Sequence, residues 1–118
     1  MMDGEKLTNR FKKEIMAAKA LAKKKENQFL GPTHLLFSMI NDENPAFLDI
    51  LKYTECKTKA LKKSLSAKLD RLPKIKAFET EIFPSAELLR ILEECEKIRR
   101  EKGDHFIPTE TFLLALSR

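Results

Sequence analysis

Glycine is scarce in this sequence: only Gly4, Gly31 and Gly103 occur among its 118 residues. A phosphate-binding P-loop and the dinucleotide-binding fingerprint each require several glycines at short spacing, because their backbones approach a phosphate closely. The chain carries neither motif, so we expect no ATP site and no cofactor in it. The few glycines and the five prolines also leave long uninterrupted stretches, which favour helices.

Histidine and cysteine are also few. Cys56 and Cys95 form no CxxC motif, and we expect two reduced thiols in a cytosolic protein. His34 and His105 belong to no HExxH motif, so no metal site is predicted. His34 lies among apolar residues and is expected to be a hydrogen-bonded core histidine, whereas His105 is expected to be exposed. No nucleophile lies in a motif with a base, so we expect no catalytic residues and no enzyme.

The sequence has no apolar run near the roughly 18 residues of a membrane span, and no apolar core of a signal peptide follows its first residues. We therefore expect a cytoplasmic protein without a membrane partner. Its net charge of +5 comes mostly from lysines at 12–25 and 57–76, interleaved with helical apolar positions. This pattern is typical of solvated helix faces, which we favour over a nucleic-acid site.

The chain contains an internal repeat with an offset of 77 residues. Phe29–Phe37 reappears in degraded form as Phe106–Leu114, and upstream Thr8 falls on Ser85. Only three paired positions are identical, but about ten apolar positions coincide. One helical unit is thus used twice, which predicts a pseudo-symmetric helical array.

Helix signals are clear in the first copy. Thr8 is a predicted N-cap, whose hydroxyl accepts a hydrogen bond from a first-turn amide. Pro32 and Pro45 suit the first position of a helix, where no N–H is needed. Helices are therefore predicted from residue 8 to about residue 25, and over 32–40, 45–53 and 57–72.

The second copy follows a connector at residues 74–84, which alternates apolar and polar side chains and is expected to be extended. Ser85 is the N-cap of the next helix, and Gly103 ends it because glycine readily adopts the left-handed conformation. Pro108 opens a last helix, which makes six helices and an all-α fold. Three side chains of the connector are expected to contact the core: Phe78, Ile82 and Phe83.

The domain organisation expected is one domain at 1–118, with repeat one at 6–73, the connector at 74–84 and a partial repeat two at 85–118. The first unit continues well past Ile40 whereas the second stops at Arg118, so the second repeat is expected to be truncated. Its last helix then exposes an apolar face, which a homodimer or a longer chain would cover. The face comprises Phe112, Leu113, Leu114 and Leu116.

Six short motifs occur in order along the chain: Leu7–Phe11, Asn27–Phe29, His34–Leu36, Arg71–Pro73, Pro84–Ser85 and Gly103–Ile107. Together they resemble the Clp N-terminal domain family, and its ClpB type more than its ClpA or ClpC type. The resemblance covers residues 6–118 and implies a pseudo-two-fold domain made of two four-helix repeats. It also implies a module that recognises unfolded or aggregated polypeptide and passes it to the attached ATPase of a disaggregase.

The same resemblance implies the site. Three polar positions tied to substrate handling in ClpB-type domains fall on Thr8, Asp104 and Glu110. An apolar groove beside them is expected to involve Ile98 and the start of the last helix, although Thr111 stands where many relatives have an apolar residue. Structural roles are an alternative for all three polar residues, as an N-cap, a loop residue after a helix, and a carboxylate in a first helical turn.

Client capture is the leading interpretation of function, and weak affinity is expected because an unfolded client loses entropy on binding. The alternative is docking of a folded adaptor protein, as in the ClpA and ClpC types, which would depend on the partner's surface charges. A nucleic-acid partner, bound through the lysines, would show a steep loss of affinity with salt. A standalone structural protein is a further alternative.

Overall fold

The computed structural model describes residues 4–75 and 81–118, and this part of the chain contains six α-helices, as predicted. It adds a short 3₁₀ helix, η1, and two strands of two residues each, which the sequence pattern did not predict. No described helix has both the length and the apolarity needed to cross a membrane. The elements are η1 (Gly4–Lys6), α1 (Asn9–Lys24), β1 (Phe29–Leu30), α2 (Pro32–Asn41), α3 (Pro45–Tyr53), α4 (Thr58–Asp70), β2 (Phe83–Pro84), α5 (Ala86–Lys102) and α6 (Thr109–Ser117).

Side-chain caps begin three of the helices where the sequence placed them. Thr8 Oγ1 accepts a hydrogen bond from the Phe11 amide at 3.2 Å, and Ser85 Oγ accepts one from the Leu88 amide at 3.1 Å. Asn44 caps α3 in the same way. Such a cap contributes about 1 kcal/mol, because it satisfies an amide that has no partner within the helix.

The two repeats exchange strands, which gives the predicted pseudo-symmetry a physical form. β1 pairs in parallel with β2, with Leu30 opposite Pro84, and an isolated parallel bridge joins Leu7 to Ile107. The offset of 77 residues carries Leu7 onto Pro84 and Leu30 onto Ile107, so the two pairings are equivalent. In each repeat, the segment before the first helix therefore pairs with the segment before the second helix of the other repeat.

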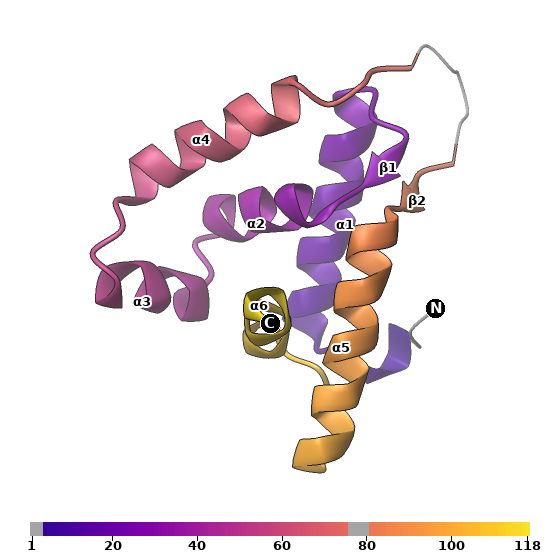
Figure 1. Cartoon of the computed structure of the whole chain (residues 1–118), viewed down its shortest axis with the longest axis vertical. Helices are drawn as coiled ribbons and strands as arrows, with labels where there is room; N and C mark the ends of the chain where they lie inside the picture. The colour runs from indigo at the N-terminus through magenta and orange to yellow at the C-terminus, as the bar shows by residue number, and fades with distance from the viewer. Residues whose placement is uncertain (1–3, 76–80) are drawn as a thin grey trace.

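The helices follow the same relation. α1 packs on α2, and α5 packs on α6, while α4 packs on α2 and α3 contacts α6. Figure 1 shows α3 and α4 as an arm that extends away from α5. One core joins the repeats, and the rings of Phe11 and Phe112 meet there with centroids 5.6 Å apart.

The expected apolar face of the last helix is exposed only in part, and the prediction was wrong for Phe112. Phe112 is fully buried, and Leu113 and Leu116 pack against the core. Of these four residues only Leu114 is classed as exposed, at 37%. α5 and α3 cover the helix, because both pack against it. The homodimer stays a prediction, and the apolar surface that could support it is smaller than expected.

The connector is only partly as expected. Ile82 packs against the core, as predicted, and Phe78 lies outside the described residues. Phe83 is instead 49% exposed, because its backbone pairs with Phe29 in the strand and its ring remains at the surface.

Candidate functional site

Thr8 lies at the point where the two repeats meet. Its side chain is half-buried and caps α1, while its backbone amide donates a hydrogen bond to the Ile107 carbonyl oxygen at 3.1 Å. The Ile107 amide donates in turn to the Lys6 carbonyl oxygen at 2.7 Å. The loop before α6 is thereby fixed against the start of α1.

Asp104 and Glu110 lie three residues on either side of Ile107 in this loop. Asp104 is exposed; its amide donates to the Arg99 carbonyl oxygen, and Arg99 Nη1 donates to the Asp104 carbonyl oxygen at 3.0 Å. Glu110 is exposed in the first turn of α6, and its carboxylate takes part in no hydrogen bond or ion pair within the described part of the chain. The structure thus brings both residues onto the segment 104–110, which contacts Thr8 and forms the Thr8 loop edge.

Ile98, the fourth predicted site residue, lies in the core with 1% of its surface exposed. Its side chain faces inward from α5 and does not line an open surface. Thr111, the departure from the family pattern, is also buried, at 5%. The apolar surface available to a ligand must therefore be formed by other residues.

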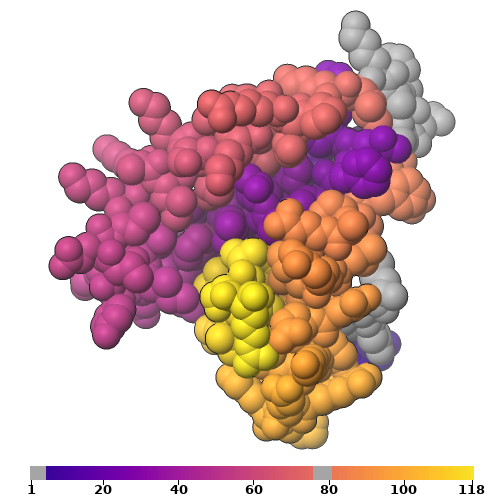
Figure 2. Space-filling view, viewed as in Figure 1, coloured from indigo at the N-terminus to yellow at the C-terminus, as the bar shows by residue number. Residues whose placement is uncertain are grey.

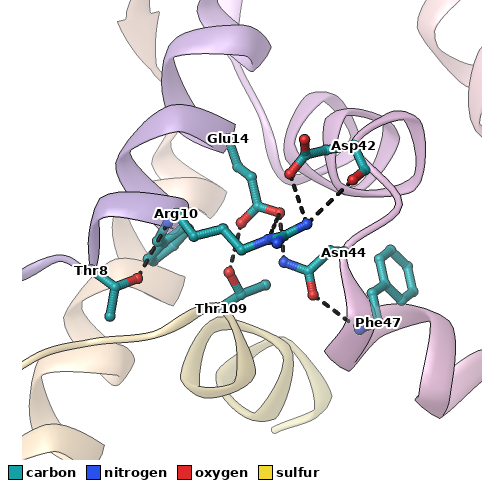
Figure 3. A network of polar contacts seen from close by, with 8 residues as sticks. Thr8, Arg10, Glu14, Asp42, Asn44, Phe47 and Thr109 are labelled. Carbon is teal, nitrogen blue, oxygen red and sulfur yellow. Dashed lines mark hydrogen bonds and ion pairs between the residues drawn. The ribbon is translucent and has the colours of Figure 1, made fainter.

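A buried carboxylate holds the start of α6 in place (Figure 3). Glu14 is 1% exposed, and it accepts hydrogen bonds from Thr109 Oγ1 and from Asn44 Nδ2, both at 2.6 Å. Arg10 lies beside it, with Nε 3.9 Å from the carboxylate, and also donates to Asp42. Since a buried charge is costly unless it is paired, these partners fix α1, α3 and α6 together next to Glu110.

Sequence reasoning missed Glu14, although a signal was present. The residue lies three positions after Phe11 and four before Ala18, on the apolar stripe of α1. An acidic residue on a buried stripe indicates either a functional group or a polar network. In this chain it forms a network that links the two repeats.

An open apolar groove of about 360 Å³ runs between the repeats. Two pairs of its lining residues, Leu7 with Pro84 and Ile15 with Leu92, are equivalent under the 77-residue offset. The groove therefore lies between equivalent surfaces of the two repeats. Leu7 lines one end of it and directly precedes Thr8 in the chain. The other lining residues are Lys19, Leu30, Leu35, Glu81, Ile82, Phe83 and Leu88.

Exposed aromatic rings extend this apolar surface. Phe83 lines the groove, and Phe29, its partner in the parallel strand pair, is 53% exposed. Exposed apolar surface of this kind, next to a groove, marks an interaction site more often than a structural feature. The sequence did not locate the groove, because it depends on strand pairing between segments that are far apart in the chain.

His34 and Cys95 are buried groups outside the groove. The Gly31 amide donates to His34 Nδ1 at 3.0 Å, so Nε2 carries the proton and donates to Asn27 Oδ1 at 3.0 Å. Burial lowers the pKa of His34 below its usual 6.5 and raises the pKa of the Cys95 thiol to about 12. His34 is thus the satisfied core histidine that was predicted, and His105 is exposed, as predicted.

Comparison with known proteins supports the resemblance noted in the sequence. Residues 6–118 match the family described as "Clp repeat (R) N-terminal domain". The chaperone protein ClpB of Dichelobacter nodosus is 28% identical over 116 residues, which cover 98% of this chain and 14% of that protein. The chain therefore spans only a small part of the curated relatives that it matches.

Solved structures agree on the fold. The N-terminal domain of Hsp104 from Candida albicans is similar with a TM-score of 0.83 and 25% identity, over 93% of this chain and 72% of that one. The N-terminal domain of the ClpV1 ATPase from E. coli gives a TM-score of 0.86 at 17% identity, over 95% of this chain and 68% of that one. At such low identity the second likeness concerns the fold alone.

Proposed function

We propose, from the premise that this chain belongs to the Clp N-terminal domain family, that it is a non-catalytic module which captures unfolded polypeptide. The ATPase that it serves is then of the ClpB disaggregase type. The observation that carries the proposal is the open apolar groove between the repeats, which reaches the Thr8 loop edge. An unfolded chain differs from a folded one chiefly in its exposed apolar side chains, and those fit such a groove.

The mechanism follows from the arrangement of the groove and the loop edge. An extended client segment lays its apolar side chains against Phe83, Leu88 and their neighbours in the groove. At the Leu7 end, Thr8 and the exposed carboxylates of Asp104 and Glu110 hydrogen-bond the client backbone or attract its basic side chains. Ile98 does not contact the client; it is a core residue whose packing holds α5 in place.

Weak binding is expected from this geometry. The groove is shallow and open, and the client loses conformational entropy when it becomes ordered. Weak binding suits a module that must release its client to an attached motor.

Docking of a folded adaptor is the second candidate, and one observation favours it. The Glu110 carboxylate is exposed and has no partner within the described part of the chain, so it is available to a cationic surface. A folded adaptor would depend on that charge and not on the groove.

The test uses an uncharged, fluorescein-labelled peptide rich in leucine, phenylalanine and serine, titrated by fluorescence anisotropy. Phe83→Ser should weaken binding about fivefold, because the variant loses roughly 1 kcal/mol of apolar contact in a half-exposed ring. The affinity of the native chain should change little with salt. Glu110→Gln should weaken binding by a smaller factor and leave the thermal melt unchanged.

Tyr53→Ser is the control. Tyr53 is an exposed aromatic residue of α3, at 90%, and lies neither among the residues that line the groove nor on the Thr8 loop edge. Equal loss of binding in the two serine variants would contradict the groove. Loss in Glu110→Gln alone, together with binding of folded cationic proteins, would support adaptor docking.

A further inference from the structure

The positive charge of the chain is concentrated on two helices, α1 and α4. Lys57–Arg71, which comprises the helix and its two caps, contains six basic residues and one acidic residue. α1 also contains six basic residues and one acidic residue, and the rest of the chain contains 11 basic and 16 acidic residues. The two helices thus carry the positive charge, and acidic residues elsewhere offset part of it.

This charge works against the stability of α4. The helix begins at Lys57 with no side-chain cap and has no acidic residue in its first turn, although the helix macrodipole favours anions there. Lys59, Lys62 and Lys63 are related by three and four positions, so their ammonium groups lie on neighbouring parts of the helix surface and repel one another. The stability of the fold therefore does not explain why lysines occupy these three positions.

The charge is not neutralised within the domain. Asp70, the one carboxylate on α4, forms an ion pair with Lys25 at 2.9 Å. In residues 4–75 and 81–118, neither Lys59, Lys62 nor Lys63 takes part in an ion pair. The Lys62 ammonium instead lies 5.8 Å from the centroid of the Phe37 ring.

The three lysines border an open groove between α4 and α2. Its volume is about 500 Å³, and its apolar surface includes Phe37 from α2 and Ala67 from α4. Lys59, Lys62 and Lys63 line it together with Ser66 and Asp70. α4 forms the upper edge of the molecule in Figure 2, and Figure 1 shows it apart from α6, so this surface is distinct from the Thr8 loop edge.

We propose that this lysine groove is a second binding surface, which accepts an acidic polypeptide segment carrying an apolar side chain. Carboxylates of the segment pair with the three lysines, and the apolar side chain contacts Phe37 and Ala67. Charge complementarity is the basis of the proposal, because three lysines that form no ion pair within the described residues line the same groove. It does not depend on the apolar groove between the repeats.

The surface fits a polypeptide better than the other polyanions. Among the residues that line the groove Phe37 is the one aromatic side chain and is only partly exposed, whereas single-stranded nucleic acid is bound by several exposed rings on which successive bases stack. None of the exposed large apolar side chains belongs to Lys57–Arg71, so α4 offers no anchor for insertion into a lipid surface.

The test uses a short fluorescein-labelled peptide in which glutamates surround one phenylalanine, titrated by anisotropy at low and moderate salt. Combining Lys59→Glu, Lys62→Glu and Lys63→Glu should weaken binding at low salt by at least about tenfold, since three ion pairs become three repulsions. The same variant should keep a thermal melting temperature close to that of the native chain, because Lys59→Glu agrees with the macrodipole while the three glutamates repel one another as the lysines did. An unchanged melt would exclude loss of binding through unfolding.

The control variant carries Lys13→Glu, Lys23→Glu and Lys102→Glu, which make the same change in net charge at exposed positions on α1 and α5. It should keep most of the affinity for the acidic peptide. Equal weakening in both variants, or no binding by the native chain, would overturn the proposal. The proposal would also be overturned if the native chain bound a single-stranded oligothymidylate, or phosphatidylserine vesicles, more tightly than the acidic peptide, and if the α4 variant abolished that binding.

The two proposals can fail separately. Phe83→Ser should leave the acidic peptide bound, and the α4 variant should leave the uncharged peptide bound. Loss of both peptides in a single variant that remains folded would show that the two surfaces are one.

Discussion

At the scale of single residues, the buried polar groups are held by specific hydrogen bonds. His34 uses both ring nitrogens, one toward Gly31 and one toward Asn27, and this arrangement requires the neutral ring. Burial favours the same neutral form, which is why the pKa of His34 is lowered. The hydrogen bond from Arg99 lowers the pKa of Glu96 to about 2.

His34 should therefore make the stability of the chain depend on pH. Above pH 6.5 the ring is neutral in both the folded and the unfolded chain, and its contribution to stability is fully present. As the pH falls below 6.5, the unfolded chain takes up a proton that the folded ring resists, so the free energy of unfolding decreases until the folded pKa is reached. Urea unfolding of the native chain at pH 7.5 and at pH 5.5, both about one unit from the ordinary histidine pKa, should show this decrease.

The control for this prediction is His105→Gln, because His105 is exposed and the variant should keep the same pH dependence. His34→Gln should flatten the dependence while lowering stability at both pH values. A flat profile in the native chain would contradict the prediction.

At the scale of elements, the sequence indicated the helices well and their ends less well. The caps Thr8, Ser85 and Asn44 were recognisable because each lies directly before an apolar helical stripe or a proline. Gly103 ends α5 at φ 70°, as expected, but the equivalent turn after α1 is made by Glu26 at φ 59°. No sequence rule indicates a glutamate in this conformation, since the surrounding chain imposes it.

The strands and the groove could not have been predicted in the same way. β1 and β2 have two residues each, which is too short for an alternating pattern to be recognised. They exist because two distant segments pair, and the apolar groove depends on that pairing. Ile98 was assigned to the groove from the family resemblance, but the side chain faces the interior, as its place on the apolar stripe of α5 indicates.

The left-handed residues suggest a stabilising substitution. Glu55 follows α3 at φ 58° and is exposed, so its side chain adds strain without making a buried contact. Glu55→Gly should raise the free energy of unfolding by about 0.5–1 kcal/mol, because glycine adopts this conformation without a steric penalty. Thermal unfolding should show a rise of about 2–8 °C for a domain of this size.

Glu55→Ala separates this effect from loss of the charge. Alanine keeps the Cβ atom and with it the left-handed penalty, so this variant should gain no stability. An equal gain in both variants would mean that removal of the carboxylate, and not relief of backbone strain, is the cause.

At the scale of the whole molecule, the repeats are joined by a shared core, by the two strand pairings and by the Glu14 network. Glu14 contacts Thr109 across a separation of 95 residues. The sequence predicted the repeat and the family, because both rest on many positions at once. It did not predict this contact, which has no equivalent in the second copy: Ile91 occupies the position that matches Glu14.

The Glu14 network should make the start of α6 sensitive to mutation. Thr109→Val keeps the shape of the side chain but removes one hydrogen bond from a buried carboxylate, which should cost about 1–3 kcal/mol of stability. Urea unfolding measures the loss. Thr58→Val, at an exposed position at the start of α4, is the control and should change stability by less than about 0.5 kcal/mol.

A loss in Thr109→Val no larger than that in Thr58→Val would show that Glu14 is adequately satisfied by Asn44 and Arg10. The peptide titration of the Thr109→Val variant is also informative. Displacement of α6 would change the binding contributed by Glu110, which the global melt does not report.

Because the repeats exchange strands, each one is complete only in the presence of the other. Neither repeat contains the partner of its own edge segment, since Leu7 pairs with Ile107 and Leu30 with Pro84. Two separate copies of such a unit would complete each other only as a swapped, symmetric pair. The chain therefore has the architecture of a domain-swapped dimer whose two subunits are covalently linked.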